Sequence, residues 1–150
     1  MFGLYYRCNI IPNDEGRLTM AKTIVFVTNQ FCCDRLIHAA RIVAEETKTE
    51  LNIVEILDNE YALDPNAIDY LFMLAKQVNA TMRLISADDK LALMKNTIAQ
   101  KDVSCVVTGM PSSHNSVLYD LWKEFPGKSF HAVDATGELV DVASNNYATA

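Results

Sequence analysis

The sequence predicts an α/β protein whose parallel sheet is covered by helices on both faces. Three observations predict it: strand segments that are apolar throughout, helical segments with one apolar stripe, and alternation of the two along the chain. Parallel strands are buried on both faces, and an alternating order favours crossover connections through helices. We expect five strands in the order 3-2-1-4-5, and the sequence leaves room for an extra edge strand at each terminus.

The first half of the chain supplies two strands and two helices. Residues 23–27 (TIVFV) form a continuous β-branched and aromatic run, and from Asp34 the apolar spacing becomes that of a helix. Residues 51–57 (LNIVEIL) predict the second strand. Pro65 suits the first turn of a second helix, which we expect to extend to about residue 78.

The second half continues the alternation. The expected elements are a strand at 82–86, a helix at 88–100, a strand at 103–108, a helix at 116–125 and a strand at 129–133. Asp88 and Asp89 suit the positive end of the dipole of the helix at 88–100. Tyr119 and Trp122, three residues apart, are expected to pack the helix at 116–125 onto the sheet.

The length of 150 residues corresponds to one domain, which we place at 21–142. Residues 1–20 are interpreted either as an added leader or extension, or as an extra edge strand at about 4–11. After the fifth strand, a turn leads to a short strand at 138–142. Residues 143–150 are a polar tail.

Charge and cysteine usage exclude several classes of protein. Thirteen basic and nineteen acidic residues give a net charge of -6, so we expect no nucleic-acid partner. No apolar run approaches the roughly 18 residues of a transmembrane helix, and the first residues lack the pattern of a signal peptide. The cysteines show no C-x-x-C spacing, which favours a reduced, cytoplasmic protein; they are Cys8, Cys32, Cys33 and Cys105.

A ligand site is expected where the strand order reverses, between the first and fourth strands. The loops facing that crevice are 28–33 and 108–115. No glycine occurs between Gly16 and Gly109, which excludes a G-x-G-x-x-G fingerprint or a P-loop after the first strand. The candidate ligand-binding residues are Thr28, Asn29, Gly109, Ser112, Ser113 and Ser116. The serines could donate to an anion at a helix N-terminus, or they could simply cap that helix.

No catalytic or metal-binding constellation is expected. Cys32 and Cys33 precede a helix, which tends to lower a thiol pKa, but small residues packing a crowded turn explain them as well. His38 is expected at the surface or partly buried in the first helix, and His131 as a packed or edge residue of the fifth strand. His114 is the best placed histidine, yet no cysteine or carboxylate accompanies it at metal-ligand spacing.

Three segments resemble the universal stress protein family: TIVFVTNQFCCDRLIHAARIVAEETKTELNIVEIL, NATMRLISADDKLALMKNTIAQKDVSCVVTGMPSS and PGKSFHAVD. Together they span about residues 22–134. The chain looks closest to the universal-stress-like domain of osmosensing potassium-transport sensor histidine kinases. That domain also carries a helix of the form "RLI…AARIA" and a "DD" that opens the third helix.

The resemblance implies a Rossmann-like five-stranded sheet, homodimers through the last strand and, in one branch of the family, ATP at the crevice. That branch carries G-x2-G-x9-G-[ST] after the fourth strand and an aspartate after the first. Here Gly109 keeps the first glycine, Ser112 stands at the second, and Trp122-Lys123 replace Gly-Ser. Thr28 and Asn29 follow the first strand, with no aspartate.

We therefore expect a non-enzymatic regulatory module of universal stress type, a cytoplasmic homodimer that acts through a protein partner or a small ligand. ATP in the family's usual geometry is not expected. The alternative is an adenine-nucleotide binder, for ATP or AMP, that uses the loops after the first and fourth strands. A cysteine-based redox or hydrolytic enzyme is the third and weakest interpretation.

Overall fold

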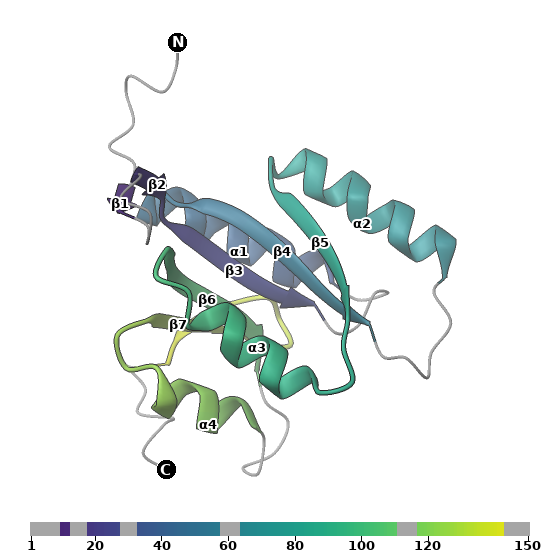
Figure 1. Cartoon of the computed structure of the whole chain (residues 1–150). Coiled ribbons are helices and arrows are strands. Elements are labelled where there is room, and N and C mark those ends of the chain that lie inside the picture. Colours follow the sequence, from purple (N-terminus) through teal and green to yellow (C-terminus); the bar gives the residue numbers. More distant parts are fainter. Residues whose placement is uncertain (1–9, 13–17, 28–32, 58–63, 111–116, 143–150) are drawn as a thin grey trace.

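The computed structural model describes residues 10–12, 18–27, 33–57, 64–110 and 117–142 (Figure 1). Strands and helices alternate as the sequence predicts. The strands are β1 (Ile10–Pro12), β2 (Leu18–Met20), β3 (Lys22–Val27), β4 (Glu50–Leu57), β5 (Thr81–Ser86), β6 (Val103–Gly109), β7 (Ser129–Val133) and β8 (Leu139–Asp141). The helices are α1 (Asp34–Thr47), α2 (Pro65–Gln77), α3 (Lys90–Ile98) and α4 (Val117–Glu124).

The main sheet has the order β5-β4-β3-β6-β7-β8. Its first five members pair in parallel and have the predicted order, with Val25 of β3 opposite Ile53 of β4 and Val107 of β6. The predicted number of five strands is wrong, because the short segment at 138–142 joins as a sixth strand. β8 runs antiparallel to β7 and covers its outer edge.

A tight turn between β7 and β8 explains the sixth strand. Asp134 accepts hydrogen bonds through Oδ1 from the backbone N–H groups of Thr136 and Glu138, at 2.9 and 3.0 Å. Gly137 has a φ of +91°, a conformation that side chains other than glycine rarely adopt. The chain therefore reverses within a few residues and returns along β7.

The edge strand expected at about 4–11 does not join the main sheet. Its described part, β1, instead pairs antiparallel with β2 in a separate two-stranded sheet. Residues 1–9 lie outside the described residues. The two outermost strands of the main sheet are thus β5 and β8.

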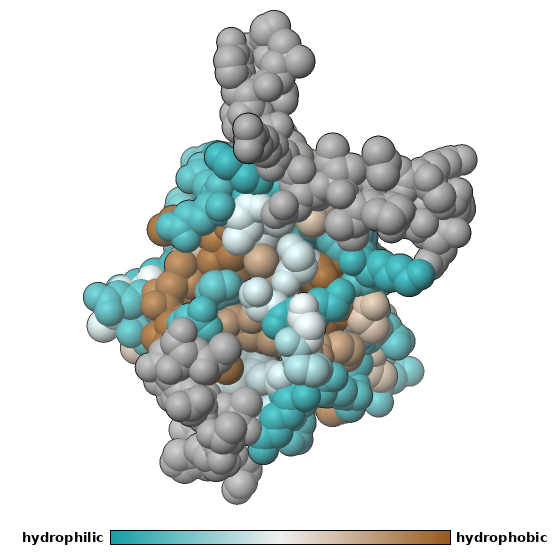
Figure 2. Space-filling model, turned by 90° about the vertical axis from the view of Figure 1, so that its left-hand side faces the viewer, coloured by the Kyte–Doolittle hydropathy of each residue, from teal (hydrophilic) through white to brown (hydrophobic). Residues whose placement is uncertain are grey.

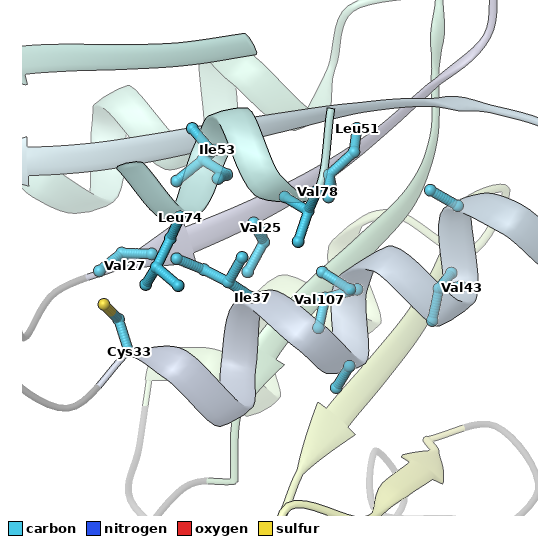
Figure 3. Close-up of a cluster of buried hydrophobic side chains, with 14 of the residues drawn as sticks. Val25, Val27, Cys33, Ile37, Val43, Leu51, Ile53, Leu74, Val78 and Val107 are labelled. Atoms are coloured by element: carbon cyan, nitrogen blue, oxygen red, sulfur yellow. The ribbon is translucent and has the colours of Figure 1, made fainter. Parts of the chain in front are cut away.

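The sheet separates two hydrophobic clusters. On one face, α1 and α2 pack on the strands through residues such as Ile37 and Leu74 (Figure 3). On the other face, Ile98 of α3 and Leu121 of α4 pack against residues such as Val106. Continuous apolar strands are needed because both faces are covered, and Val25, for example, is completely buried.

Local capping determines where two helices begin. The carboxylate of Asp64 accepts from the N–H groups of Asn66 and Ala67, so α2 begins at Pro65. Asp89 caps α3 in the same way through the N–H of Ala92. The helix expected at 88–100 is therefore shorter, because Asp89 stands before it as its N-cap.

The surface is mixed in character. On the face shown in Figure 2, hydrophobic residues gather toward the middle and hydrophilic residues lie around them. Within the described ranges, no helix is both long enough and apolar enough to cross a membrane.

Candidate functional site

A cavity of about 600 Å³ opens at the carboxyl edge of the sheet. It lies where β6 and β7 end and α1 begins, and it is lined by Asp34, Arg35, Leu36, Gly109, Val133, Asp134 and Ala135. Ligands of open α/β sheets bind at this edge, and pockets of this volume accept small molecules. Its described walls carry two carboxylates and one guanidinium.

Arg35 ties two of the cavity's walls together. From the first turn of α1, its guanidinium Nη1 donates to the backbone carbonyl of Ala135. Its aliphatic stem packs over Gly137, where an added Cβ would lie 3.4 Å from the Arg35 Cδ. The single cation of the described lining is therefore already engaged by the β7–β8 turn.

Both carboxylates of the cavity accept hydrogen bonds from protein groups. Tyr70 of α2 donates its hydroxyl to Asp34, and this hydrogen bond raises the pKa of Tyr70. The hydrogen bond from the Thr136 side chain, followed by that from the Glu138 backbone, lowers the pKa of Asp134. Asp134 is therefore ionised at neutral pH, and it adds negative charge to the cavity wall.

Glu55 is a second acidic feature near this edge. In β4 it lies opposite Val27 of β3 and Leu84 of β5, and its residue surface is 2% exposed. Among the described residues, its Oε2 atom has no hydrogen-bond partner. Burial raises its pKa to about 7, although Lys90 acts in the opposite direction.

The structure places one of the six candidate ligand-binding residues in the cavity. Gly109 ends β6 and lines the wall, and no described atom lies within 4 Å of a Cβ built on it. The other five candidates lie outside the described residues; they are Thr28, Asn29, Ser112, Ser113 and Ser116.

Three charged lining residues were not among the candidates. Asp34, Arg35 and Asp134 directly follow the loop or strand that ends at this edge. The signal that could have found them is their position in the chain, because the residues after parallel strands gather at the carboxyl edge.

Trp122 occupies the place where the ATP-binding branch carries its last glycine. It is 4% exposed and belongs to the cluster beneath α3 and α4. Its ring meets that of Tyr119 edge to face, with centroids 5.1 Å apart. The expectation that these two residues pack α4 onto the sheet is confirmed.

Two solved structures with this arrangement are universal stress proteins. A protein of that family from Burkholderia pseudomallei has 15% sequence identity and a TM-score of 0.52, over 72% of this chain and 92% of its own. The universal stress protein from Archaeoglobus fulgidus has 14% identity and a TM-score of 0.52, over 69% and 87% of the two chains. The chain has the universal stress protein fold.

This likeness confirms the predicted α/β architecture, and at these identities it concerns the fold. No model of a protein family matches the sequence, and no curated protein sequence does. The narrower resemblance to the kinase-associated domain stays a prediction.

Proposed function

We propose that the chain is a non-enzymatic regulatory module of universal stress type, which acts through a partner or a small ligand and does not bind ATP in the family's usual manner. The observation that carries the proposal is the charge of the cavity at the carboxyl edge. Asp34 and Asp134 line it, and Arg35 is held by Ala135. A triphosphate placed there would meet carboxylates in place of free cations.

The sequence around the site supports the same conclusion. Close approach of a phosphate to the backbone needs glycines, because a Cβ blocks it. Of the three glycines that the ATP-binding branch carries after its fourth strand, Gly109 alone has a counterpart here. Trp122, at the third position, contributes to the core instead.

A second candidate function, binding of an adenine nucleotide in a variant geometry, is favoured by the position of the cavity. It lies at the carboxyl edge beside Gly109, and its volume of about 600 Å³ suits a ligand of this size. In this alternative, Thr28, Asn29 and the serines after β6 would contribute hydrogen bonds.

Homodimerisation through the end of the sheet is part of the proposal. The outer edge of β7 is covered by β8, so the edge offered to a second copy is that of β8. An unpaired edge strand invites addition of another strand, and a two-fold axis lets identical edges pair.

A thermal-shift panel of ATP, AMP and cyclic dinucleotides tests the proposal. We expect no saturable increase in melting temperature with ATP. Saturable stabilisation by any nucleotide would favour the second candidate, and Gly109→Leu, which fills the cavity, would then abolish it. Gly127→Leu is the matched control, because no atom of the described residues lies within 4 Å of a Cβ at Gly127 and Gly127 is not among the described lining of the cavity.

A further inference from the structure

A cysteine, a histidine and an aspartate lie on one face of three neighbouring strands. Cys105 of β6 is opposite Ser129 of β7, and His131 lies two residues further along β7. Asp141 of β8 is directly opposite His131. Paired residues of adjacent strands point to the same face, so all three side chains face α1. This group lies away from the cavity described above.

The thiol of Cys105 is surrounded by hydrogen-bonding groups. His131, Ser104, Thr23 and Thr47 all form side-chain hydrogen bonds with it, the Ser104 Oγ at 3.7 Å from the sulfur. Cys105 is 4% exposed, whereas His131 is only half-buried. The imidazole therefore stands between the buried sulfur and the surface.

A chain of hydroxyl groups extends from the thiol into the protein. The Thr23 and Thr49 hydroxyl oxygens are 2.6 Å apart, and those of Thr49 and Thr47 are 2.9 Å apart. Thr47 also donates to the backbone carbonyl of Val43 at 2.7 Å. Thr23 is completely buried and Thr49 nearly so, which keeps this chain away from solvent.

Both protonation states of the thiol satisfy this chain, because a hydroxyl donates once and also accepts. A neutral thiol can donate to Thr23, which donates to Thr49, then Thr47, then the Val43 carbonyl. A thiolate can accept from Thr23, which accepts from Thr49, which accepts from Thr47. When the proton of Cys105 leaves to solvent, rotation of three hydroxyls is therefore enough to satisfy the thiolate.

The hydrogen bonds and the burial of Cys105 together lower the pKa of its thiol. Burial raises its pKa, but the hydrogen bonds outweigh burial, that of His131 first, and hold the pKa below the ordinary value of a thiol. The thiolate is the nucleophilic form of cysteine.

We propose that Cys105 is an oxidation site, at which the sulfur, held against His131 and the threonine hydroxyls, reacts with hydrogen peroxide. The thiolate attacks one peroxide oxygen, so an S–O bond forms while the O–O bond breaks. The sulfur is oxidised by two electrons to a sulfenic acid, and the peroxide is reduced. The departing hydroxide takes a proton from solvent and leaves as water.

Cys33 provides an internal control. It is 1% exposed, it is not in a disulfide, and its surroundings are the apolar cluster on the same face of the sheet. Figure 3 shows it at the start of α1, with Val43 near the other end of the helix. Cys33 is as buried as Cys105 but does not belong to the group around His131, so comparing the two cysteines separates the effect of that group from the effect of burial.

The test is oxidation of the whole reduced chain by hydrogen peroxide at neutral pH. After the peroxide is removed, unfolding in urea with dimedone and N-ethylmaleimide labels sulfenic acids and remaining thiols, and peptide mass spectrometry quantifies each cysteine. We expect Cys105 to be oxidised about tenfold faster than Cys33 in the folded protein. In urea the two rates should converge. A Cys105 rate in the folded protein that is equal to or below that of Cys33 would overturn the proposal.

His131→Gln tests the role of the imidazole. We expect the Cys105 rate to fall by about fivefold and its rise with pH to move to higher pH, since the hydrogen bond with His131 no longer lowers the pKa of the thiol. His38→Gln is the matched control, because His38 is exposed on α1. An unchanged pH profile in a folded His131→Gln protein would remove the histidine from the proposal. Were that variant unfolded, the comparison of Cys105 with Cys33 in the native chain would decide.

Discussion

Gly137 is the residue at which the backbone requires glycine most strictly. Its φ of +91° disfavours any side chain, whereas the nearest atom to an added Cβ, the Arg35 Cδ at 3.4 Å, is only in van der Waals contact. We predict that Gly137→Ala lowers the free energy of unfolding by about 1–2 kcal/mol, measured by urea denaturation.

The matched control is Gly127→Ala. In the described part of the chain no atom lies within 4 Å of a Cβ at Gly127, and the residue does not have a positive φ. This substitution should leave stability nearly unchanged. Equal effects of the two substitutions would show that the β7–β8 turn does not depend on a left-handed residue.

Glu55 gives the fold a specific dependence on pH. Its pKa is raised by burial from 4.5 to about 7, so the folded state holds the proton more tightly than the unfolded state. The contribution of this group is fully present below pH 4.5 and is lost as the pH rises through 7. We predict that Glu55→Gln, which keeps a neutral side chain, removes this loss.

Urea denaturation at pH 5 and pH 8 measures the effect of Glu55. Between these values the native chain should lose about 1–2 kcal/mol of stability through this group, a figure reduced for screening by solvent. The stability that Glu55→Gln loses between pH 5 and pH 8 should be smaller than the native chain's loss by this amount. Asp69→Asn, on the exposed face of α2, is the control. Identical pH dependence in the Glu55 variant and the native chain would contradict the assignment.

At the scale of single residues, sequence reasoning found the position of Gly109 but not the cavity's charged walls. Asp34 was recognised only as the start of a helix, and Asp134 only as part of a turn. Their shared location depends on α1 and the β7–β8 turn meeting at one edge of the sheet, which is a tertiary relation. The Cys105–His131 contact was missed for the same reason: twenty-six residues separate the two in sequence, and the register of β6 and β7 brings them together.

At the scale of elements, α2 depends on its N-cap. The Asp64 carboxylate accepts from the backbone N–H of Asn66 at 2.9 Å and from that of Ala67 at 3.4 Å. We predict that Asp64→Ala destabilises the protein by about 1 kcal/mol in thermal or urea unfolding. Asp64→Asn retains a capping oxygen and should cost much less. A loss as large in the asparagine variant would mean that charge, not capping, is the cause.

The central elements could be predicted because their sequences leave little choice. Runs such as that of β3 are buried on both faces, so hydrophobic patterning alone locates them. At the edges, the short strand at 138–142 was predicted, but its place as the sixth strand of the main sheet was left open. β8 has three residues, and its pairing depends on the Asp134 and Gly137 turn rather than on a hydrophobic run. β1 likewise has three residues, and its pairing with β2 gives no periodic signal in the sequence.

At the scale of the whole molecule, the edge of β8 gives the prediction on assembly. We expect multi-angle light scattering at tens of micromolar protein to give twice the chain mass of 16.8 kDa. Asp141→Pro, at the end of β8, should shift the assembly toward the monomer, because the backbone N–H of Asp141 points away from β7 and proline removes it. Arg83→Ala on the opposite edge, β5, is the control. A native mass of 16.8 kDa would contradict the dimer.

The fold also explains how the chain can share the universal stress protein architecture and still differ from the ATP-binding branch in the residues of this cavity. The parallel sheet creates a cavity at its carboxyl edge whatever the residues there are. Here that cavity is lined by two carboxylates and one engaged arginine, and the core takes up Trp122 where the ATP-binding branch has glycine. Architecture and ligand chemistry are therefore separate properties of this molecule.

Isothermal titration calorimetry of the native chain with ATP and Mg²⁺ tests the central claim most directly. Our account predicts no saturable heat at ATP concentrations up to about 1 mM, which corresponds to a binding free energy weaker than about -4 kcal/mol. A saturable isotherm with a micromolar Kd, lost in Gly109→Leu and kept in Gly127→Leu, would contradict it.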